Sequence, residues 1–324
     1  IEHLNMSRLL AIRPDLIPDL ETTNWQLDSI VTELKSKRRV WRAEQQRPHY
    51  FGGRNLPSRD AVQTIVKALG QALCPMRLGP IDLHQEAEDY YVGLQLDSAL
   101  KALYTQARLE LAYDAHLAQI AQGTLASIQL DQQAKEIVQT FASTLPRIRQ
   151  DLDADVLAAF HGDPAARSVD EVLMCYPGIK AMIFHRIAHE WYVLGLPLLA
   201  RMLAELSHSE TGIDIHPGAT IASGFFIDHG TGVVIGETAT IGKNVRLYQA
   251  VTLGAKRFEK NEDGTLAKDY VRHHTVEDEV VIYAGATILG NITIGRGSVI
   301  GGNVWLTHSV PPHSHISQEH SSRM

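Results

Sequence analysis

A six-residue period in the C-terminal third of the chain restricts its fold more than any other feature of the sequence. From Ile213 onward, glycine is frequent and aliphatic residues recur at every sixth position. They form three runs: Ile215, Ile221 and Ile227; Ile235, Ile241, Leu247 and Leu253; and Val276, Ile282, Ile288, Ile294, Ile300 and Leu306. This period is typical of a β-helix, in which each unit is a short strand plus a turn and one aliphatic side chain per unit points inward. It disfavours a β-sandwich, whose strands return about every 8–12 residues.

The residues before this repeat predict helices. One apolar face recurs at helical spacing and contains Ala134, Ile137, Val138, Phe141 and Leu145. The positions of helix-capping residues, prolines and glycines predict further helices over 59–73, 169–175, 179–194 and 197–206. We therefore expect an α+β protein with an all-α helical domain over 1–210, a parallel β-helix over 211–312 and a polar tail over 313–324.

Composition excludes several classes of protein. The net charge of −7 argues against broad nucleic-acid binding, which needs a basic surface. No apolar run approaches the roughly 18 residues of a membrane helix. The two cysteines, Cys74 and Cys175, match no metal spacing, so we expect a reducing, cytoplasmic location and no disulfide. We expect Cys175, on a predicted helix beside Met174, to be a buried structural thiol.

Two breaks in the repeat indicate where function lies. The step from Ile227 to Ile235 is two residues longer than a unit, and it contains Asp228 and His229. The step from Leu253 to Val276 is not a multiple of six, so a polar loop over 256–275 must leave the coil. Excursions from a regular solenoid often carry function. Histidine suits a general base because its ordinary pKa lies near neutrality.

With these motifs the chain resembles the serine acetyltransferase family. The matching stretches are Asp214–Gly218 (DIHPG), Ile227–Glu237 (IDHGTGVVIGE), Gln249–Gly254 (QAVTLG), Arg272–His273, Ile288–Gly297 (ILGNITIGRG), Asp163–Ala165 (DPA) and Asn55–Arg59 (NLPSR). The resemblance implies a left-handed β-helix that forms homotrimers, with active sites between subunits, and often a hexamer made of two trimers. It also implies transfer of an acetyl group from acetyl-CoA to the hydroxyl of L-serine, the first step of cysteine biosynthesis.

The resemblance assigns a role to each candidate site residue. His229 matches the general base, and Asp214 matches the residue that orients its imidazole. Asp163 and Asp228 match positions that hold the amino acid and suit its ammonium group, whereas Arg272 suits its carboxylate. His273 matches a further substrate position and could stabilise the oxyanion of the tetrahedral intermediate.

The donor, acetyl-CoA, is expected along the third run of the repeat. In the family's pattern, backbone groups near Gly254, Ala284 and Gly302 contact its pantetheine arm. A lysine that some members carry near the cofactor phosphate is replaced here by Val299. We expect direct transfer within a ternary complex, with no acetyl-enzyme and no metal.

Three other readings stay open. A hydratase of the carbonic-anhydrase kind also uses trimeric β-helices, and the 16 histidines, among them His274, His313 and His315, could include zinc ligands. However, we expect His313 and His315 to lie outside the coil. The second alternative is an acetyltransferase that acts on another hydroxyl or amine acceptor. The third is a binding role: many family members dock a C-terminal tail ending in isoleucine into O-acetylserine sulfhydrylase, but this chain ends in Ser-Ser-Arg-Met324, which does not predict that complex.

Overall fold

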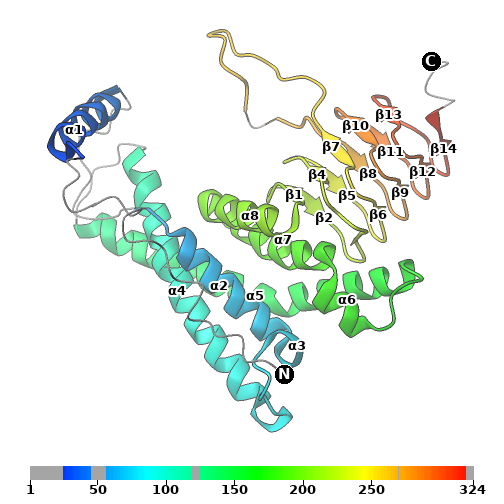
Figure 1. Cartoon of the computed structure of the whole chain (residues 1–324), viewed down its shortest axis with the longest axis horizontal. Coiled ribbons are helices and arrows are strands. Elements are labelled where there is room, and N and C mark those ends of the chain that lie inside the picture. Colours follow the sequence, from blue (N-terminus) through cyan, green and yellow to red (C-terminus); the bar gives the residue numbers. More distant parts are fainter. Residues whose placement is uncertain (1–24, 45–55, 118–123, 269, 319–324) are drawn as a thin grey trace, which may run out of the picture. The chain divides into compact units, whose positions relative to one another are not determined.

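The computed structural model describes residues 25–44, 56–117, 124–268 and 270–318 (Figure 1). The chain divides into two compact units, Ile1–Asn55 and Leu56–Met324. The first unit contains α1 (Leu27–Glu44), within which no residue is buried. Residues 1–24 and 45–55 of the predicted helical domain and 319–324 of the predicted tail lie outside the described residues.

The second unit begins with helices, as the sequence predicts. They are α2 (Arg59–Leu73), α3 (Pro75–Leu78), the 3₁₀ helix η3 (Gln85–Ala87), α4 (Glu88–Leu117), α5 (Thr124–Gly162), α6 (Val169–Cys175), α7 (Pro177–Val193) and α8 (Pro197–Thr211). Ser58 caps α2 by accepting a hydrogen bond from the N–H of Ala61. The apolar face predicted between Ala134 and Leu145 lies on α5 and is buried. No helix in the described ranges is long and apolar enough to cross a membrane.

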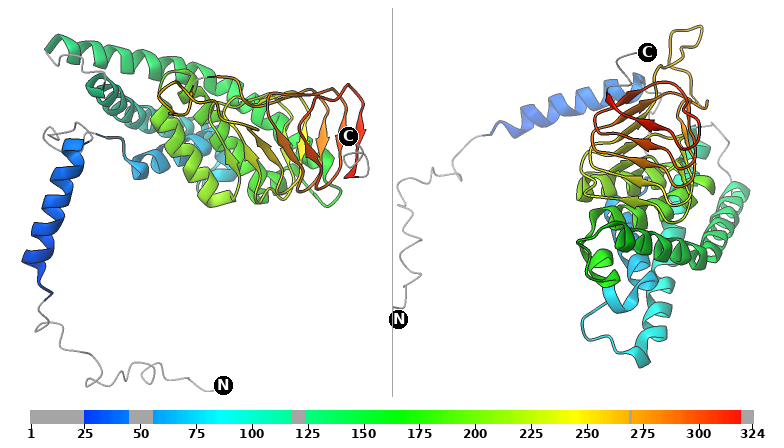
Figure 2. Two further views of the ribbon diagram at one scale, coloured as in Figure 1. Left: turned by 90° about the horizontal axis from the view of Figure 1, so that it is seen from above. Right: turned by 90° about the vertical axis from the view of Figure 1, so that its right-hand side faces the viewer.

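A left-handed parallel β-helix follows, which confirms the predicted fold class. Its strands are β1 (Asp214–Ile215), β2 (Thr220–Ile221), β3 (Phe226–Ile227), β4 (Val234–Ile235), β5 (Thr240–Ile241), β6 (Arg246–Leu247), β7 (Thr252–Gly254), β8 (Thr275–Val276), β9 (Val281–Ile282), β10 (Thr287–Leu289), β11 (Thr293–Ile294), β12 (Val299–Ile300), β13 (Trp305–Leu306) and β14 (His315–Ile316). Figure 2 shows the stacked coils from two further directions. Every aliphatic residue of the three predicted runs is buried, because it is the inward-facing residue of its unit.

The strands form three parallel sheets, one for each side of the coil. Sheet A has the order β1-β4-β7-β10-β13, sheet B the order β11-β8-β5-β2, and sheet C the order β14-β12-β9-β6-β3. The coil therefore has three corners, which we name by the sheets that they join. The C–A corner contains residues 228–233, 248–251, 283–286 and 301–304, and the A–B corner contains residues 216–219, 236–239, 255–268 and 270–274.

A buried ion pair fastens the helices to the first coil. Both carboxylate oxygens of Asp155 on α5 accept hydrogen bonds from the guanidinium of Arg186 on α7, at 2.7 and 2.8 Å. Asp155 also accepts the backbone N–H of Phe225, at the start of β3, at 2.9 Å. Asp155 is fully buried and Arg186 nearly so. This pair therefore fixes the end of α5 relative to the start of β3.

The structure corrects three predictions. Cys175 is exposed rather than buried, because it ends a short helix whose inward face is occupied by Val172. The coil continues past residue 312, because β14 pairs with β12 and brings His315 into sheet C. The last helix extends to Thr211, where Gly212 in the left-handed conformation (φ +69°) ends it.

Candidate active site

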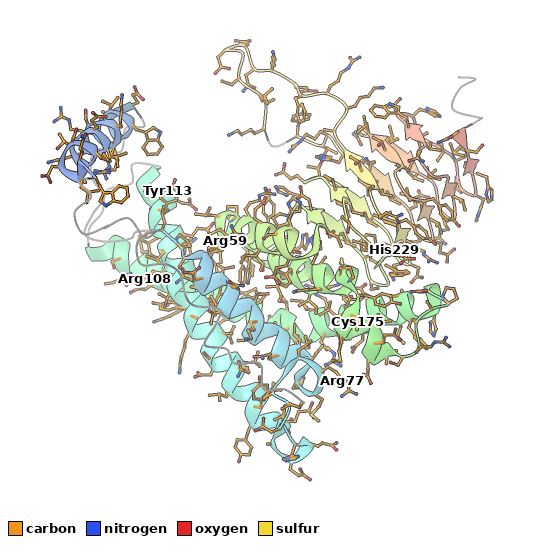
Figure 3. The ribbon with its side chains drawn as sticks, viewed as in Figure 1. Arg59, Arg77, Arg108, Tyr113, Cys175 and His229 are labelled. Carbon is orange, nitrogen blue, oxygen red and sulfur yellow. The ribbon has the colours of Figure 1, made fainter. Side chains whose placement is uncertain are left out.

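His229 lies at the C–A corner, two residues after the end of β3. Its backbone is left-handed (φ 59°), a conformation that histidine tolerates better than most residues, and 71% of its side chain is exposed. Its Nδ1 lies 3.8 Å from Oδ1 of Asp228, which is itself buried. Figure 3 shows the ring at the edge of the coil, near the α6–α7 region that carries Cys175. The predicted base is therefore accessible to a substrate and lies next to a carboxylate.

Asp163 reaches this corner from the loop after α5. Its Oδ1 accepts the backbone N–H of Ala165 at 2.8 Å, and its Oδ2 accepts the hydroxyl of Tyr176 at 2.5 Å. The Tyr176 hydrogen bond is the main reason that the pKa of Asp163 is lowered, and the positive charges of Arg246 and His229 lower it further. The same contact with Asp163 raises the pKa of Tyr176 to about 12. Asp163 is therefore an anion over the physiological pH range, held by a neutral phenol.

Arg246 is a member of this site that the sequence did not reveal. Its Nη2 donates to Oδ2 of Asp228 at 2.9 Å, and its guanidinium lies over the rings of Phe226 and Tyr248, 5.0 and 4.7 Å from their centroids. Parallel pairing of β3 with β6 places Arg246 directly beside Phe226. The coil register would have predicted this contact, whereas in the linear sequence two strands, β4 and β5, lie between the two residues. One carboxylate oxygen of Asp228 is thus already paired with a cation within the chain.

A second cluster lies at the A–B corner. Nη2 of Arg272 forms a short ion pair with Oε2 of Glu237, and the Tyr192 hydroxyl donates to Oε1 at 2.8 Å. Burial opposes ionisation of Glu237, but the hydrogen bonds from Tyr192 and Arg272 outweigh it and lower the pKa of this carboxyl. Glu237 therefore holds the guanidinium of Arg272 in one orientation.

The hydrogen bonds around His273 fix the position of its ring proton. The hydroxyl oxygen of Thr238 accepts the backbone N–H groups of Arg272 and His273, at 3.0 and 3.1 Å, so its own hydrogen is free for Nδ1 of His273, 2.8 Å away. The Thr238 N–H also points to Nδ1, at 3.2 Å. Burial lowers the pKa of His273, and the charge of Arg272 adds to this effect. The neutral ring therefore carries its proton on Nε2.

Asp214 starts β1, and its backbone N–H bonds the carbonyl of Val233. Among the described residues, no hydrogen bond or ion pair joins its carboxylate to His229, and the carboxylate paired with that ring belongs to Asp228. The orienting role of Asp214 stays a prediction.

The residues expected to contact acetyl-CoA are divided between the two corners. Ala284 and Gly302 follow β9 and β12 at the C–A corner, where the Ala284 carbonyl accepts the N–H of Asn303 at 2.9 Å. Gly254 ends β7 where the chain enters the A–B corner. One chain therefore displays His229, Ala284 and Gly302 at one corner, and Gly254 at the other, with Arg272 and His273.

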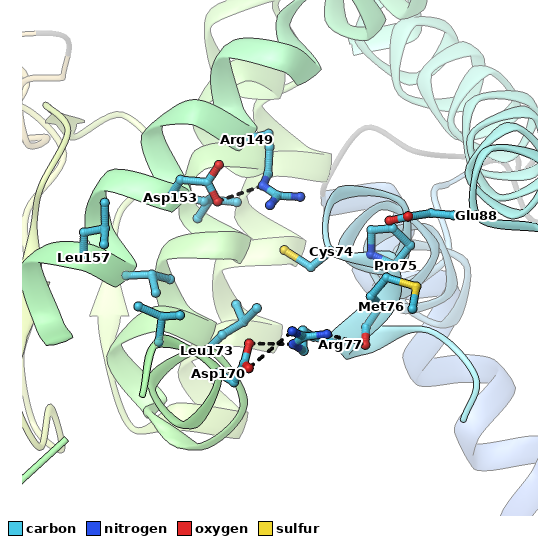
Figure 4. Close-up of a pocket in the computed structure, with 13 residues that line it drawn as sticks. Cys74, Pro75, Met76, Arg77, Glu88, Arg149, Asp153, Leu157, Asp170 and Leu173 are labelled. Carbon is cyan, nitrogen blue, oxygen red and sulfur yellow. Dashed lines mark hydrogen bonds and ion pairs between the residues drawn. The ribbon is translucent and has the colours of Figure 1, made fainter. Parts of the chain in front are cut away.

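Within the described residues, neither a metal-binding cluster nor the cavity shown in Figure 4 offers an alternative to this site. No group of three or more His, Cys, Asp or Glu residues in the described ranges could hold a metal ion. A cavity of about 500 Å³ lies among the helices, lined by Cys74 and by the ion pairs Arg77–Asp170 and Arg149–Asp153 (Figure 4). None of the predicted site residues lines it.

Comparisons with known proteins agree with the sequence motifs. The family described as bacterial transferase hexapeptide (six repeats) matches residues 273–308. The chain is 54% identical to the plasmid serine acetyltransferase of Synechococcus elongatus over 91% of both chains. Its structure is similar to that of Entamoeba histolytica serine acetyltransferase 1 in complex with L-cysteine, with a TM-score of 0.68, 36% identity, and coverage of 78% of this chain and 86% of that one. Neisseria gonorrhoeae serine acetyltransferase in complex with serine gives a TM-score of 0.50 at 28% identity, covering 80% of this chain and 95% of that one.

Proposed function

Since this chain belongs to the serine acetyltransferase family, it transfers the acetyl group of acetyl-CoA to the hydroxyl of L-serine, and we propose that His229 is the general base of this reaction. One observation carries the proposal: the exposed imidazole lies beside Asp228 and close enough to Asp163 for the protonated ring to lower the pKa of that carboxyl. A carboxylate near the ring can hold the ammonium group of an amino acid, so that the hydroxyl of the same molecule reaches the imidazole.

We propose that the ammonium group binds chiefly to Asp163. Asp228 already forms an ion pair with Arg246, whereas among the described residues the hydrogen-bond donors to the Asp163 carboxylate are both neutral. A cationic group therefore gains more from Asp163 than from Asp228. Asp228 instead lies beside the imidazole, where its negative charge favours the imidazolium that forms during the reaction.

The second half of the site comes, in this proposal, from a neighbouring copy in a homotrimer. Arg272 and His273 lie at a different corner from His229, so one chain cannot surround a substrate with both sets. Three β-helices around a threefold axis would each place a C–A corner against the A–B corner of the next copy. Arg272 would then bind the serine carboxylate, and the Nε2 proton of His273 would stabilise the oxyanion. Pairing of two trimers stays a prediction.

The reaction that follows needs no covalent enzyme intermediate. The imidazole of His229 removes the hydroxyl proton as the serine oxygen attacks the thioester carbonyl. The tetrahedral oxyanion collapses, the carbon–sulfur bond breaks, and the imidazolium returns its proton to the leaving thiolate. We place the pantetheine arm between Ala284 and Gly302 of one copy and Gly254 of the next.

Replacement of His229 by Ala tests the role of the base. We expect kcat to fall by about 10²–10⁴, the range typical of general bases, while the oligomer stays intact by light scattering. Replacement of Asp163 by Asn should instead raise KM for L-serine more than KM for acetyl-CoA. Near-normal kcat in the His229 variant would refute the proposal.

A mixing experiment tests the shared site. His229→Ala chains and His273→Ala chains, each inactive alone, are unfolded together and refolded as mixed trimers. If each site takes one histidine from each of two copies, about a quarter of the sites regain both residues in a random mixture. Mixed trimers with no regained activity would show that a single chain supplies both histidines.

A cytoplasmic location is the final part of this proposal. Cys74 and Cys175 are both free thiols, and one of them is exposed, which suits a reducing compartment.

A further inference from the structure

Tyr176 forms the joint between α6 and α7 and has a fixed backbone. It ends α6 and precedes α7 in an extended conformation (φ −83°, ψ 120°). Its N–H bonds the carbonyl of Val172 at 3.1 Å, and its own carbonyl accepts the N–H of Lys180 at 3.2 Å. Pro177, the first residue of α7, restricts the joint further. The position of the phenol is therefore set by two helices at once.

The joint is also packed against the end of β3. A Cβ on Gly178 would lie 3.2 Å from the backbone carbon of Ile227 and closer still to its carbonyl oxygen, so only glycine allows this approach. Ile227 directly precedes Asp228 and His229. Tyr176 is thus held at a fixed distance from the base, although 53 residues of sequence separate it from His229.

The Tyr176 hydroxyl then restricts the rotation of the Asp163 carboxylate. This carboxylate lies in a loop after α5, on the residue before Pro164, and each of its oxygens accepts one hydrogen bond. The Ala165 N–H alone would leave the second oxygen free to turn toward solvent. When both hydrogen bonds are made, the carboxylate cannot rotate, and its remaining lone pairs point in fixed directions.

We propose that Tyr176 is a positioning residue for the acceptor substrate: its hydroxyl orients the Asp163 carboxylate so that it receives the ammonium group of L-serine beside His229. This inference rests on the proposed function of Asp163. The phenol acts through the carboxylate and need not touch the substrate. Phenylalanine would fill the same space but would leave Oδ2 of Asp163 without its donor.

The charged groups around Asp163 explain why a neutral hydroxyl, that of Tyr176, suits the task of orienting this carboxylate. Arg246 and His229 face the carboxylate from the β-helix, and Asp228 lies close enough to act on Tyr176. A second cation beside Asp163 would compete with the substrate ammonium, as Arg246 does at Asp228. A phenol that stays protonated orients the anion without cancelling its charge.

The test compares two acceptors in Tyr176→Phe. L-Serine carries the ammonium group, and 3-hydroxypropanoate lacks it. We expect KM for L-serine to rise about tenfold or more, the effect of losing one hydrogen bond to a charged group, with little change in KM for acetyl-CoA. The ratio of kcat/KM for L-serine to that for 3-hydroxypropanoate should fall by a similar factor. A merely structural role would lower both values equally and leave the ratio unchanged, which would overturn the inference.

Two further variants separate the inference from the proposed function. In an Asp163→Asn background, Tyr176→Phe should have no additional effect on KM for L-serine, because both changes remove the same interaction. If Asp163→Asn itself leaves that KM unchanged, the proposed ammonium site is wrong. If Asp163→Asn raises it and Tyr176→Phe does not, only the positioning role is wrong. Tyr90→Phe, at an exposed position among the helices, controls for loss of a tyrosine hydroxyl.

Discussion

Replacement of Gly236 by Ala should disable the A–B half of the site through a single methyl group. Gly236 follows β4, and its φ is not in the left-handed region, so the backbone itself accepts alanine. The obstacle is His273: an added Cβ would lie 2.7 Å from its Cε1 and closer to Nε2 and Cδ2. Real Cβ contacts are ordinary only from about 3.4 Å, and Nε2 would lie at 2.0 Å, so the imidazole must move by more than about 1 Å.

That movement has a defined effect on catalysis. The ring is tethered at Nδ1 by Thr238, so it can retreat only by breaking this bond or by turning Nε2 away from its present direction. A displacement of about 1 Å in a reacting group typically costs on the order of 10²-fold. We therefore expect kcat/KM for L-serine to fall about 100-fold in Gly236→Ala, together with a lower Tm.

The assay is thiol release from acetyl-CoA, combined with a double-mutant cycle. If Gly236→Ala acts only by displacing His273, then His273→Ala and the double variant should have the same kcat/KM. The double variant should also regain much of the lost Tm, because the methyl group then meets no ring. Gly93→Ala is the matched control, since a Cβ there has no heavy atom within 4 Å. Retention of more than a third of the parental kcat/KM by Gly236→Ala would refute the reasoning.

Three other predictions concern stability and accessibility. Asp155→Ala leaves the buried Arg186 without its bidentate partner and with only Asp151, 3.8 Å away, so urea unfolding should show a loss of about 3–5 kcal/mol, whereas Asp153→Ala, at an exposed pair, should lose less than about 1 kcal/mol; equal losses would contradict this. Burial lowers the pKa of His274 from 6.5 to about 4, so protonation favours the unfolded chain as the pH falls through this window. The Tm of His274→Val should therefore rise relative to that of the parent as the pH falls from 8 to 5. A Tm difference that stays constant over this range would contradict the argument. Cys175 should react with a thiol reagent in the native protein, one equivalent per chain, and the other cysteine only after unfolding; two fast equivalents would contradict the burial pattern.

The sequence by itself determined the β-helix and the identity of most candidate site residues. A period of six leaves one way to bury an aliphatic residue in every unit, so Ile235, Ile241 and Leu247 fall inward without any long-range information. The break after Ile227 likewise located His229 at a corner. These features depend on a local geometry that repeats along the chain, and the spacing of the residues is sufficient to predict that geometry.

Only the tertiary structure decided how the site residues are held and divided. The contact of Asp163 with Tyr176 joins residues 13 positions apart. That separation matches neither a helical turn nor the six-residue unit, and the contact depends on how the loop after α5 packs against the α6–α7 junction. The placement of His229 and His273 at different corners follows from the three-sided closure of the coil. Spacing along the chain specifies which side chains face inward, but the side chains that face one another across corners and helices are set by packing.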